Sequence, residues 1–175
     1  MNRDGRLVIV GGGPVGLATA RAYRDAGGLA RVVVLTTEPY PPYNRPPLTK
    51  DFLRGESDRE DLPLETEAWY GENDVELRLS TAVGAVDRER ATVETDTGER
   101  LPYDACVLAT GSEPVRIPAP GADDPEILVM RTLENSARLR GRVGEGDTAV
   151  VVGSGFIGCE AAASLALPGG FGHAR

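Results

Sequence analysis

Two glycine-rich hexapeptides are the segments of this sequence whose residue types and spacing point most directly to chemistry. Both fit the pattern G-x-G-x-x-G, in which the first glycine makes a tight turn and the second lets the backbone approach a pyrophosphate. The third glycine allows the following helix to pack closely. The first hexapeptide contains Gly11, Gly13, Pro14, Val15 and Gly16, and the second contains Gly153, Gly155 and Gly158.

The context of the first hexapeptide supports a dinucleotide site more strongly than the pattern alone, since the chain holds 22 glycines. Glu38 follows the next apolar run, where a carboxylate can accept hydrogen bonds from both ribose hydroxyls and would repel a 2'-phosphate. The alternative is a structural glycine turn with a solvated Glu38. The corresponding residue of the second hexapeptide would lie past Arg175, so NADH and NADPH are not distinguished.

The segments that flank the hexapeptides predict the elements that this chemistry needs. Residues 7–10 and 31–35 are expected as buried parallel strands, with a helix over 15–26 between them. Residues 149–152 and 157–167 repeat the strand and the helix around the second hexapeptide. Two such units in one chain argue for two dinucleotides, and hence for electron transfer between them.

The segment between the two units is expected to hold a stiff loop and a small second sheet. Five of the nine residues 39–47 are proline, which predicts an irregular loop. Residues 48–70 are expected to be partly helical, 105–109 to form a buried strand, and 132–142 a surface helix. Short runs separated by turn residues predict an antiparallel meander appended to the parallel sheet: 75–79, 82–87, 91–95 and 99–101.

Composition and charge limit the function classes. An apolar content of 41% with 26% charged residues is typical of a globular protein, and the apolar run before Gly11 is too short for a signal sequence or a membrane span. We therefore expect a cytoplasmic protein with no membrane partner. The net charge of -8 disfavours a nucleic-acid surface. Cys106 and Cys159 lie far apart without a nearby Cys or His, which argues against a metal site or a disulfide scaffold.

A further segment identifies a family resemblance. Pro42-Tyr-Asn-Arg-Pro-Pro-Leu-Thr-Lys50 resembles the signature of the ferredoxin, rubredoxin and putidaredoxin reductase branch of the FAD-dependent pyridine nucleotide-disulfide oxidoreductases, which also contains apoptosis-inducing factor. The resemblance implies FAD in a first Rossmann domain and NADH or NADPH in a second. The fold class expected is α/β, an FAD-binding Rossmann-like parallel sheet with helices and a small antiparallel β-meander, followed by a truncated second Rossmann unit.

The resemblance also implies roles for single residues. Arg45 and Lys50 would lie along FAD, with the lysine beside the reactive edge of the flavin, and Glu160 would pair with that lysine. Lys50 and Glu160 are the expected catalytic residues; the alternatives are a surface lysine and a first-turn helix acid. The remaining residues expected at the cofactors, besides Glu38 and the two hexapeptides, are Val83, Ala109, Thr110, Gly111 and Arg131.

The implied activity is electron transfer from NAD(P)H through flavin to an iron-sulfur protein such as a ferredoxin or rubredoxin. Residues 38–55 contain no cysteine, which argues against a thiol relay as the mechanism. The expected domains are an FAD-binding segment over 1–112, a linker over 113–126, and the start of a truncated NAD(P)H-binding domain over 127–175. Residues 168–175, with His173, depart from the family pattern, as a truncation or a shifted reading frame would.

Two other interpretations stay open from the sequence. One is a non-catalytic or decayed fragment that at most binds FAD, because the expected strand 149–152 and the helix after it lack neighbours to cover their apolar faces. The other is a pair of NAD-type Rossmann units with no flavin. The proline-rich segment from Arg45 to Lys50 argues against this interpretation.

Overall fold

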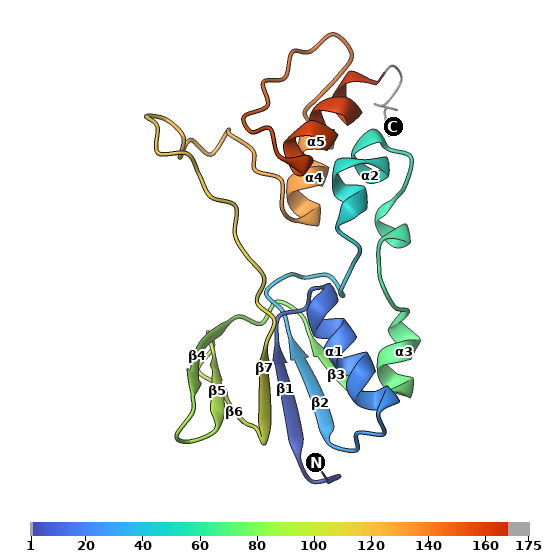
Figure 1. Cartoon of the computed structure of the whole chain (residues 1–175), viewed down its shortest axis with the longest axis vertical. Coiled ribbons are helices and arrows are strands. Elements are labelled where there is room, and N and C mark those ends of the chain that lie inside the picture. Colours follow the sequence, from blue (N-terminus) through green and yellow to red (C-terminus); the bar gives the residue numbers. More distant parts are fainter. Residues whose placement is uncertain (1, 168–175) are drawn as a thin grey trace. The chain divides into compact units, whose positions relative to one another are not determined.

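A computed structural model describes residues 2–167 of the chain, which form two compact units (Figure 1). Unit 1 joins the residues up to Tyr43 with Pro63–Gly111, and unit 2 joins Asn44–Leu62 with the residues from Ser112 onwards. The expected departure of the C-terminal tail from the family pattern falls outside the described residues. The expected domain boundaries at residues 112 and 126 stay predictions.

A four-stranded parallel sheet is the centre of unit 1. Its strands lie in the order β3 (Val75–Arg78), β2 (Arg31–Leu35), β1 (Arg6–Val10) and β7 (Ala105–Leu108), and every neighbouring pair is parallel. The two innermost strands are almost entirely apolar and buried, as expected for a sheet that is covered on both faces. This arrangement brings the carboxyl ends of all four strands to one edge of the sheet, where ligands bind in open α/β sheets.

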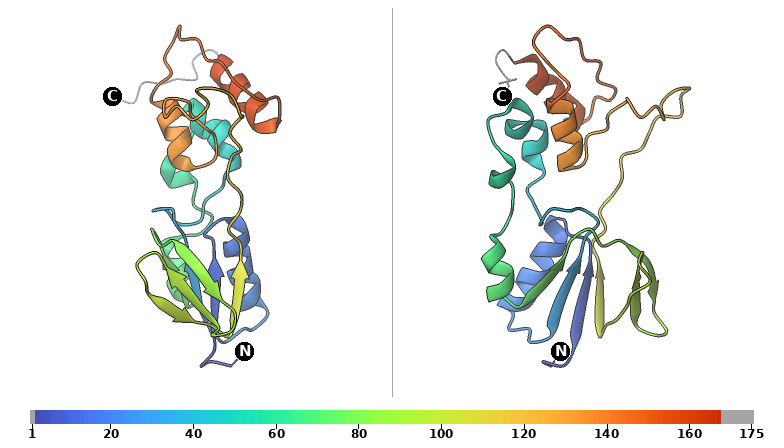
Figure 2. Two further views of the ribbon diagram at one scale, coloured as in Figure 1. Left: turned by 90° about the vertical axis from the view of Figure 1, so that its left-hand side faces the viewer. Right: turned by 180° about the vertical axis from the view of Figure 1, so that it is seen from behind.

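Alternate side chains of these strands pack against different layers. On one face Ile9 and Val34 pack with helix α1 (Pro14–Asp25) and with Tyr70 of helix α3 (Glu67–Glu72). On the other face Val8 and Val33 pack with a separate antiparallel sheet, whose strands are β4 (Val83–Asp87), β5 (Thr92–Thr95) and β6 (Arg100–Pro102) (Figure 2). The expected fold class, a parallel sheet with helices and a small antiparallel sheet, is confirmed.

The expected four-run meander is wrong in one respect. Residues 75–78 form β3 at the edge of the parallel sheet, where Val75 pairs with Val32, and they do not join the antiparallel sheet. The reason is packing: Val75 is buried in the same apolar cluster as Tyr70, so helix α3 serves as the crossover into a parallel strand. The antiparallel sheet therefore has three strands.

The expected irregular loop over residues 39–47 is wrong at its end, because the proline-rich segment enters regular structure in unit 2. Pro46–Thr49 form the 3-10 helix η1, and α2 (Asp51–Arg54) and η2 (Arg59–Asp61) follow it. Proline is tolerated there because its fixed φ suits the first helical positions, whose N–H groups have no partner within the helix. The 3-10 helix turns the chain so that Thr49 and Lys50 come directly before α2.

Unit 2 also contains α4 (Leu133–Arg140) and α5 (Phe156–Ala166), but the expected strand over residues 149–152 is absent. Val150 and Val152 are 86% and 72% exposed. A strand needs a neighbour to pair its backbone N–H and C=O groups, and none of the strands in residues 2–167 pairs with this segment. The expected second Rossmann unit is therefore present as its glycine turn and helix only.

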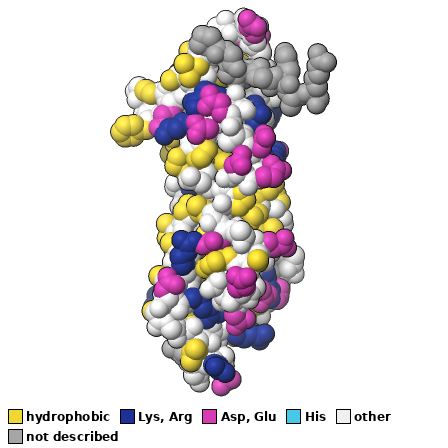
Figure 3. Space-filling model, turned by 90° about the vertical axis from the view of Figure 1, so that its right-hand side faces the viewer, with side chains coloured by type: hydrophobic (Ala, Val, Ile, Leu, Met, Phe, Trp, Pro, Cys, Tyr) yellow, Lys and Arg dark blue, Asp and Glu magenta, His cyan; other side chains and the backbone are white. Residues whose placement is uncertain are grey.

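No helix within residues 2–167 is long and apolar enough to cross a bilayer. On the face drawn in Figure 3, basic and acidic side chains are interspersed, without a large region of one sign.

Candidate functional site

The first glycine hexapeptide forms the turn between β1 and α1, and a Cβ would collide with a neighbouring atom at three of its glycines, Gly11, Gly12 and Gly16. Gly11 has a φ of +117°, and a Cβ there would collide with the carbonyl oxygen of Ala109. A Cβ at Gly16 would collide with the carbonyl oxygen of Gly11, so the helix can approach the turn only without a side chain. By contrast, a Cβ at Gly13 would meet no heavy atom within 4 Å. Gly13 thus borders open space, as a glycine beside a ligand would.

The second hexapeptide repeats this geometry. Gly153 has a φ of +122°, and Gly155 is the N-cap of α5 as Gly13 is of α1. A Cβ at Gly153 or at Gly155 would meet no heavy atom within 4 Å. A Cβ at Gly158 would collide with the carbonyl oxygen of Gly153. The internal repeat expected from the sequence therefore holds at the level of backbone conformation, although its strand is missing.

The N-terminal ends of α1 and α5 are suited to an anion. Neither N-cap glycine offers a side chain to the first N–H groups, and neither first turn contains an acidic residue. Pro14 occupies the first position of α1, and the Val15 side chain is 66% exposed. Unpaired N–H groups and the positive end of the helix dipole favour phosphate at such an end.

Glu38 follows β2, at the strand end next to the first turn. The Gly11 N–H donates a 2.8 Å hydrogen bond to the carbonyl of Leu35, and a Cβ at Gly12 would collide with the side chain of Thr36. The Glu38 N–H donates to Oγ1 of Thr36 at 3.3 Å. These contacts bring the end of β2 against the turn, so the expected ribose-binding acid and the expected pyrophosphate turn lie together.

Tyr43 is a further residue at Glu38, and the sequence analysis did not single it out. Its hydroxyl donates a 2.5 Å hydrogen bond to Oε2 of Glu38, and its side chain is only 4% exposed. A buried phenol that donates to one carboxylate oxygen restricts the orientation of that carboxylate. The only signal for this role in the sequence is an aromatic residue five positions beyond the acid.

The end of β7 also lies beside the first turn. The Ala109 N–H donates a 2.7 Å hydrogen bond to the carbonyl of Val10, and Gly111 has a φ of +75°. Leu108 is 66% exposed although it belongs to a strand, so its side chain is available to a ligand. Of the other expected residues, Thr110 lies within this segment, and Val83 begins β4 and packs against the core between the sheets.

Four expected residues of unit 2 line one pocket of about 300 Å³: Arg45, Lys50, Arg131 and Glu160. Lys50 Nζ lies 3.2 Å from Glu160 Oε1, and an Arg45 guanidinium nitrogen donates to the carbonyl of Arg131 at 2.8 Å. The pocket thus holds three cationic side chains and one carboxylate. Such a lining suits an anionic or electron-rich planar ligand.

Glu160 has a second partner in Thr49, whose Oγ1 donates a 2.7 Å hydrogen bond to Oε2. The hydrogen bond from Thr49, followed by the contact with Lys50, lowers the pKa of Glu160 below its ordinary value. The carboxylate is therefore ionised at neutral pH. Thr49 was not among the expected site residues, because a threonine beside a lysine carries no distinctive pattern.

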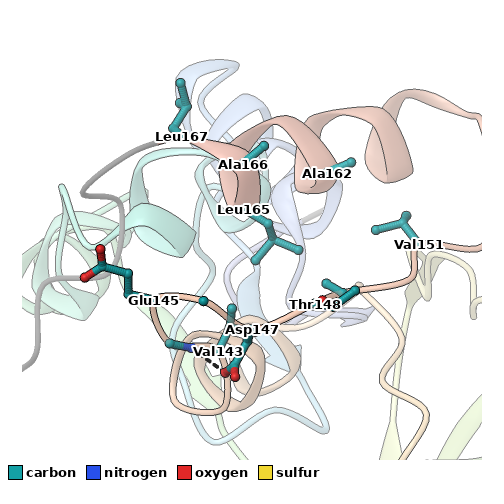
Figure 4. A pocket seen from close by; sticks show the side chains of 12 residues that line it. Val143, Glu145, Asp147, Thr148, Val151, Ala162, Leu165, Ala166 and Leu167 are labelled. Carbon is teal, nitrogen blue, oxygen red and sulfur yellow. Dashed lines mark hydrogen bonds between the residues drawn. The ribbon is translucent and has the colours of Figure 1, made fainter.

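A larger pocket in unit 2, of about 570 Å³, contains none of the expected residues. It lies between residues 143–149 and the C-terminal half of α5, and its lining includes Val151, Ala162 and Leu165 (Figure 4). Its polar groups are Glu145, Thr148 and Asp147, and the last accepts a 2.8 Å hydrogen bond from the Gly144 N–H. Size alone does not make it the functional site, since the charged groups capable of chemistry converge in the smaller pocket.

The remaining candidates for chemistry are few within residues 2–167. No group of three or more His, Cys, Asp or Glu side chains there could hold a metal ion. Cys106 is half-buried, and burial raises the pKa of its thiol, while Cys159 is exposed. A thiol with a raised pKa is a poor nucleophile.

Comparisons with known proteins agree with this geometry. The family described as "Pyridine nucleotide-disulphide oxidoreductase" matches residues 5–169. A probable ferredoxin reductase of Castellaniella defragrans is 36% identical over 170 residues, which cover 97% of this chain and 42% of that protein. Rubredoxin-NAD(+) reductase of Pseudomonas putida is 34% identical over 158 residues, which cover 90% of this chain and 41% of that protein.

Solved structures show the same likeness. A putidaredoxin reductase in covalent complex with putidaredoxin matches 94% of this chain and 40% of its own length, with a TM-score of 0.86 and 32% identity. A ferredoxin reductase from Rhodopseudomonas palustris matches 92% of this chain and 40% of its own, with a TM-score of 0.87 and 34% identity. The chain thus spans about two fifths of the length of these two reductases of Castellaniella defragrans and Pseudomonas putida.

Proposed function

Because the chain belongs to the pyridine nucleotide-disulphide oxidoreductase family, we propose that it is the FAD-holding part of an NAD(P)H-dependent reductase that passes electrons to an iron-sulfur protein. The resemblance found in residues 42–50 is confirmed by relatives named as ferredoxin and rubredoxin reductases. The observation that carries the proposal is the first glycine turn: Gly13 borders open space, and Glu38 lies at the adjacent strand end.

The residues of unit 1 fit the ADP portion of FAD. A side chain at Gly11 or Gly16 would collide with the backbone of the turn and its surroundings, and Gly13 leaves room for a pyrophosphate beside the N-terminal end of α1. Glu38 would accept hydrogen bonds from the ribose hydroxyls, with its orientation limited by Tyr43. The segment from Ala109 to Gly111 is the second part of this binding surface.

The residues of unit 2 fit the flavin portion. Arg45, Lys50 and Arg131 supply positive charge to one pocket, and Glu160 holds the ammonium group of Lys50 in place. When bound, FAD supplies the conversion of a two-electron hydride transfer into single-electron steps. The chain's own contribution is to bind, to orient, and to place a fixed positive charge.

The second glycine turn supports NAD(P)H as the electron donor. Gly155 borders open space at the N-terminal end of α5, as Gly13 does at α1. Gly153, Gly155 and Gly158 would hold the pyrophosphate of that nucleotide. The name of the Pseudomonas putida relative favours NADH over NADPH. No cysteine lies between Glu38 and Gly55, so the proposed mechanism contains no thiol relay.

The acceptor class rests on the named relatives. Their names specify rubredoxin and ferredoxin, and one solved structure is a complex with putidaredoxin. We extend this to an iron-sulfur acceptor for the present chain, and we keep the cytoplasmic location as part of the same proposal. No nucleic-acid or membrane partner is proposed.

The test of FAD binding is a visible absorption spectrum of the purified chain after incubation with FAD and desalting. We expect a retained flavin band for the unaltered chain and its loss in Gly13→Val, whose side chain would begin in the open space beside the turn. Circular dichroism checks that the variant is folded. A flavin band of equal strength in both chains would overturn the proposed site.

A second candidate function is a nucleotide-binding module without turnover. It is favoured by residues 149–152, which form no strand and leave Val150 and Val152 exposed beside the second glycine turn. The deciding experiment is oxidation of NADH or NADPH by the FAD-loaded chain with ferricyanide as acceptor. Turnover supports the reductase, whereas retained flavin without turnover supports the binding module.

A further inference from the structure

We propose that Thr49 is a positioning residue that fixes the carboxylate of Glu160 for its ion pair with Lys50. The role rests on the proposed function, because it matters for electron transfer only if Lys50 faces a bound flavin. No sequence motif indicates this role, since Thr49 and Glu160 are 111 positions apart and meet only in the folded chain.

The two oxygens of the Glu160 carboxylate have different partners. Oε2 accepts a 2.7 Å hydrogen bond from Thr49 Oγ1, and Oε1 lies 3.2 Å from Lys50 Nζ. A carboxylate held at one oxygen can turn its other oxygen in few directions. Thr49 therefore determines where the ammonium group of Lys50 finds its counter-charge.

Thr49 is the rigid member of this trio. Its residue is 7% exposed, whereas the side chains of Lys50 and Glu160 are 44% and 34% exposed. A β-branched side chain has restricted χ1 freedom, while lysine has four rotatable bonds and much rotamer entropy to lose. An exposed ion pair alone stabilises little, so the buried hydroxyl supplies the directional constraint that the pair lacks.

The hydroxyl of Thr49 has one proton and two nearby acceptors. The carbonyl of Pro46 lies 3.4 Å from Oγ1, and the Glu160 carboxylate lies at 2.7 Å. A hydrogen bond to an ionised acceptor is shorter and stronger than one to a carbonyl. The proton therefore points to Glu160, which is the dominant reason that the pKa of Glu160 is lowered.

The backbone of Thr49 is held from the same helix that carries Glu160. Ser164 is 2% exposed, and its Oγ donates a 2.6 Å hydrogen bond to the carbonyl of Thr49. Glu160 and Ser164 are four positions apart on α5 and therefore lie on one face of it. One residue of η1 thus receives two contacts from α5, one at its side chain and one at its backbone, which fixes the register of the two elements.

The other charged groups around Glu160 do not provide the same constraint. Arg45 and Arg131 line the pocket, but the guanidinium of Arg45 donates to the carbonyl of Arg131. Lys50 is the cation paired with Glu160 among the described residues. Loss of the Thr49 hydroxyl would leave the carboxylate free to rotate and to move with the lysine.

The test uses the chain without cofactor and measures the side-chain carboxyl of Glu160 by ¹³C NMR during a pH titration. The Glu160 signal is assigned by its loss in Glu160→Gln. We expect the midpoint of Glu160 to rise towards the ordinary glutamate value in Thr49→Val, which removes the hydroxyl and keeps the shape. Thr49→Ser, which keeps the hydroxyl, should leave the midpoint unchanged.

A matched control separates positioning from general loosening. Ser136→Ala removes another buried hydroxyl, which donates a 2.6 Å hydrogen bond to the carbonyl of Leu48 in the same 3-10 helix but does not touch Glu160. Its Glu160 midpoint should equal that of the unaltered chain. If Thr49→Val does not give the dispersed spectrum of a folded chain, Thr49→Ala supplies the same comparison.

An unchanged midpoint in Thr49→Val, or an equal rise in Ser136→Ala, would overturn the proposal. Either result is independent of flavin, because the titration is done without it. If FAD binds but the titration midpoint of Glu160 is unchanged in Thr49→Val, only the positioning role fails. If the titration midpoint of Glu160 rises in Thr49→Val but the chain retains no FAD, only the proposed function fails.

Discussion

Tyr43 donates a 2.5 Å hydrogen bond to Glu38, so the acid at the end of β2 is held by a buried phenol from the proline-rich segment. The two residues belong to the same unit, and the loop between them contains Pro39, Pro41 and Pro42. Prolines limit the conformations of this loop in the unfolded and the folded chain. The acid is therefore oriented before any ligand arrives, which lowers the entropy lost on binding.

Glu38→Ala is expected to weaken FAD binding more than Tyr43→Phe. The first change removes the acceptor of the ribose hydroxyls and should raise the dissociation constant at least about tenfold, which corresponds to about 1.4 kcal/mol. The second keeps the carboxylate and loses only its orientation, so we expect about a threefold rise. Flavin fluorescence titration measures both. An equal loss in the two variants would mean that the phenol contacts the ligand directly.

Gly16→Ala is expected to destabilise unit 1, because the added methyl group would collide with the carbonyl oxygen of Gly11. Overpacking of this kind costs about 1–3 kcal/mol. Gly71→Ala is the matched control: Gly71 also lies in a helix, with no heavy atom within 4 Å of its Cβ position, so alanine there should stabilise by up to about 1 kcal/mol. Urea unfolding followed by circular dichroism compares the two, and a stable Gly16→Ala variant would show that the helix can shift.

Tyr70→Phe is expected to raise the stability of unit 1 at neutral pH by about 1 kcal/mol. The Tyr70 hydroxyl is buried and has no hydrogen-bond partner within residues 2–167, and leaving a polar group unsatisfied is costly. Its ring packs edge-on against Trp69, with centroids 5.3 Å apart, and phenylalanine preserves this contact. The unfolding free energies of the two chains at pH 7 provide the measurement.

The same tyrosine predicts a loss of stability in alkali. Burial raises the pKa of Tyr70 to about 12, above its ordinary value of 10, so its un-ionised form is favoured in the folded chain. The folded-state contribution is complete below pH 10 and is lost as the pH rises towards 12, by about 2–3 kcal/mol in all. Tyr70→Phe lacks this loss, so its advantage should widen between pH 8 and pH 11. Parallel stability curves would contradict the assignment.

Amide hydrogen exchange should distinguish the two glycine-turn regions. The amides of Val8, Ile9 and Val10 lie in the parallel sheet and should exchange orders of magnitude more slowly than those of residues 150–152, which form no strand. Exchange followed by NMR or mass spectrometry at neutral pH gives both rates. Slow exchange at residues 150–152 would mean that this segment pairs with another strand in solution, for example from a second copy.

The sequence predicted local features well and pairings less well. Residues 7–10 and 149–152 are both short apolar runs before a glycine turn, yet only the first is a strand. The difference is not local: β1 has β2 and β7 on its two sides, while residues 149–152 have no strand beside them in the described chain. Residues 75–78 were assigned to the wrong sheet for the same reason, because periodicity indicates a strand and not its neighbour.

The candidate site follows the same division. The glycines and Glu38 were predictable because their spacing is set within one strand, turn and helix. Lys50, Arg131 and Glu160 were predicted from family resemblance only, and the pocket that gathers them is formed by three separate stretches of chain. Thr49 and Tyr43 were missed, since each acts by a hydrogen bond to an expected residue and has no pattern of its own.

A Cβ at Gly158 would collide with the carbonyl oxygen of Gly153, and one at Gly16 with that of Gly11, so each steric requirement lies within six residues of the chain. In the second hexapeptide this close approach is present although residues 149–152 form no strand. A turn of this kind matches its sequence pattern whether or not strands pair beside it. A search for this pattern therefore finds the phosphate-facing corner of a nucleotide domain, and only strand pairing reveals whether the domain around it is assembled.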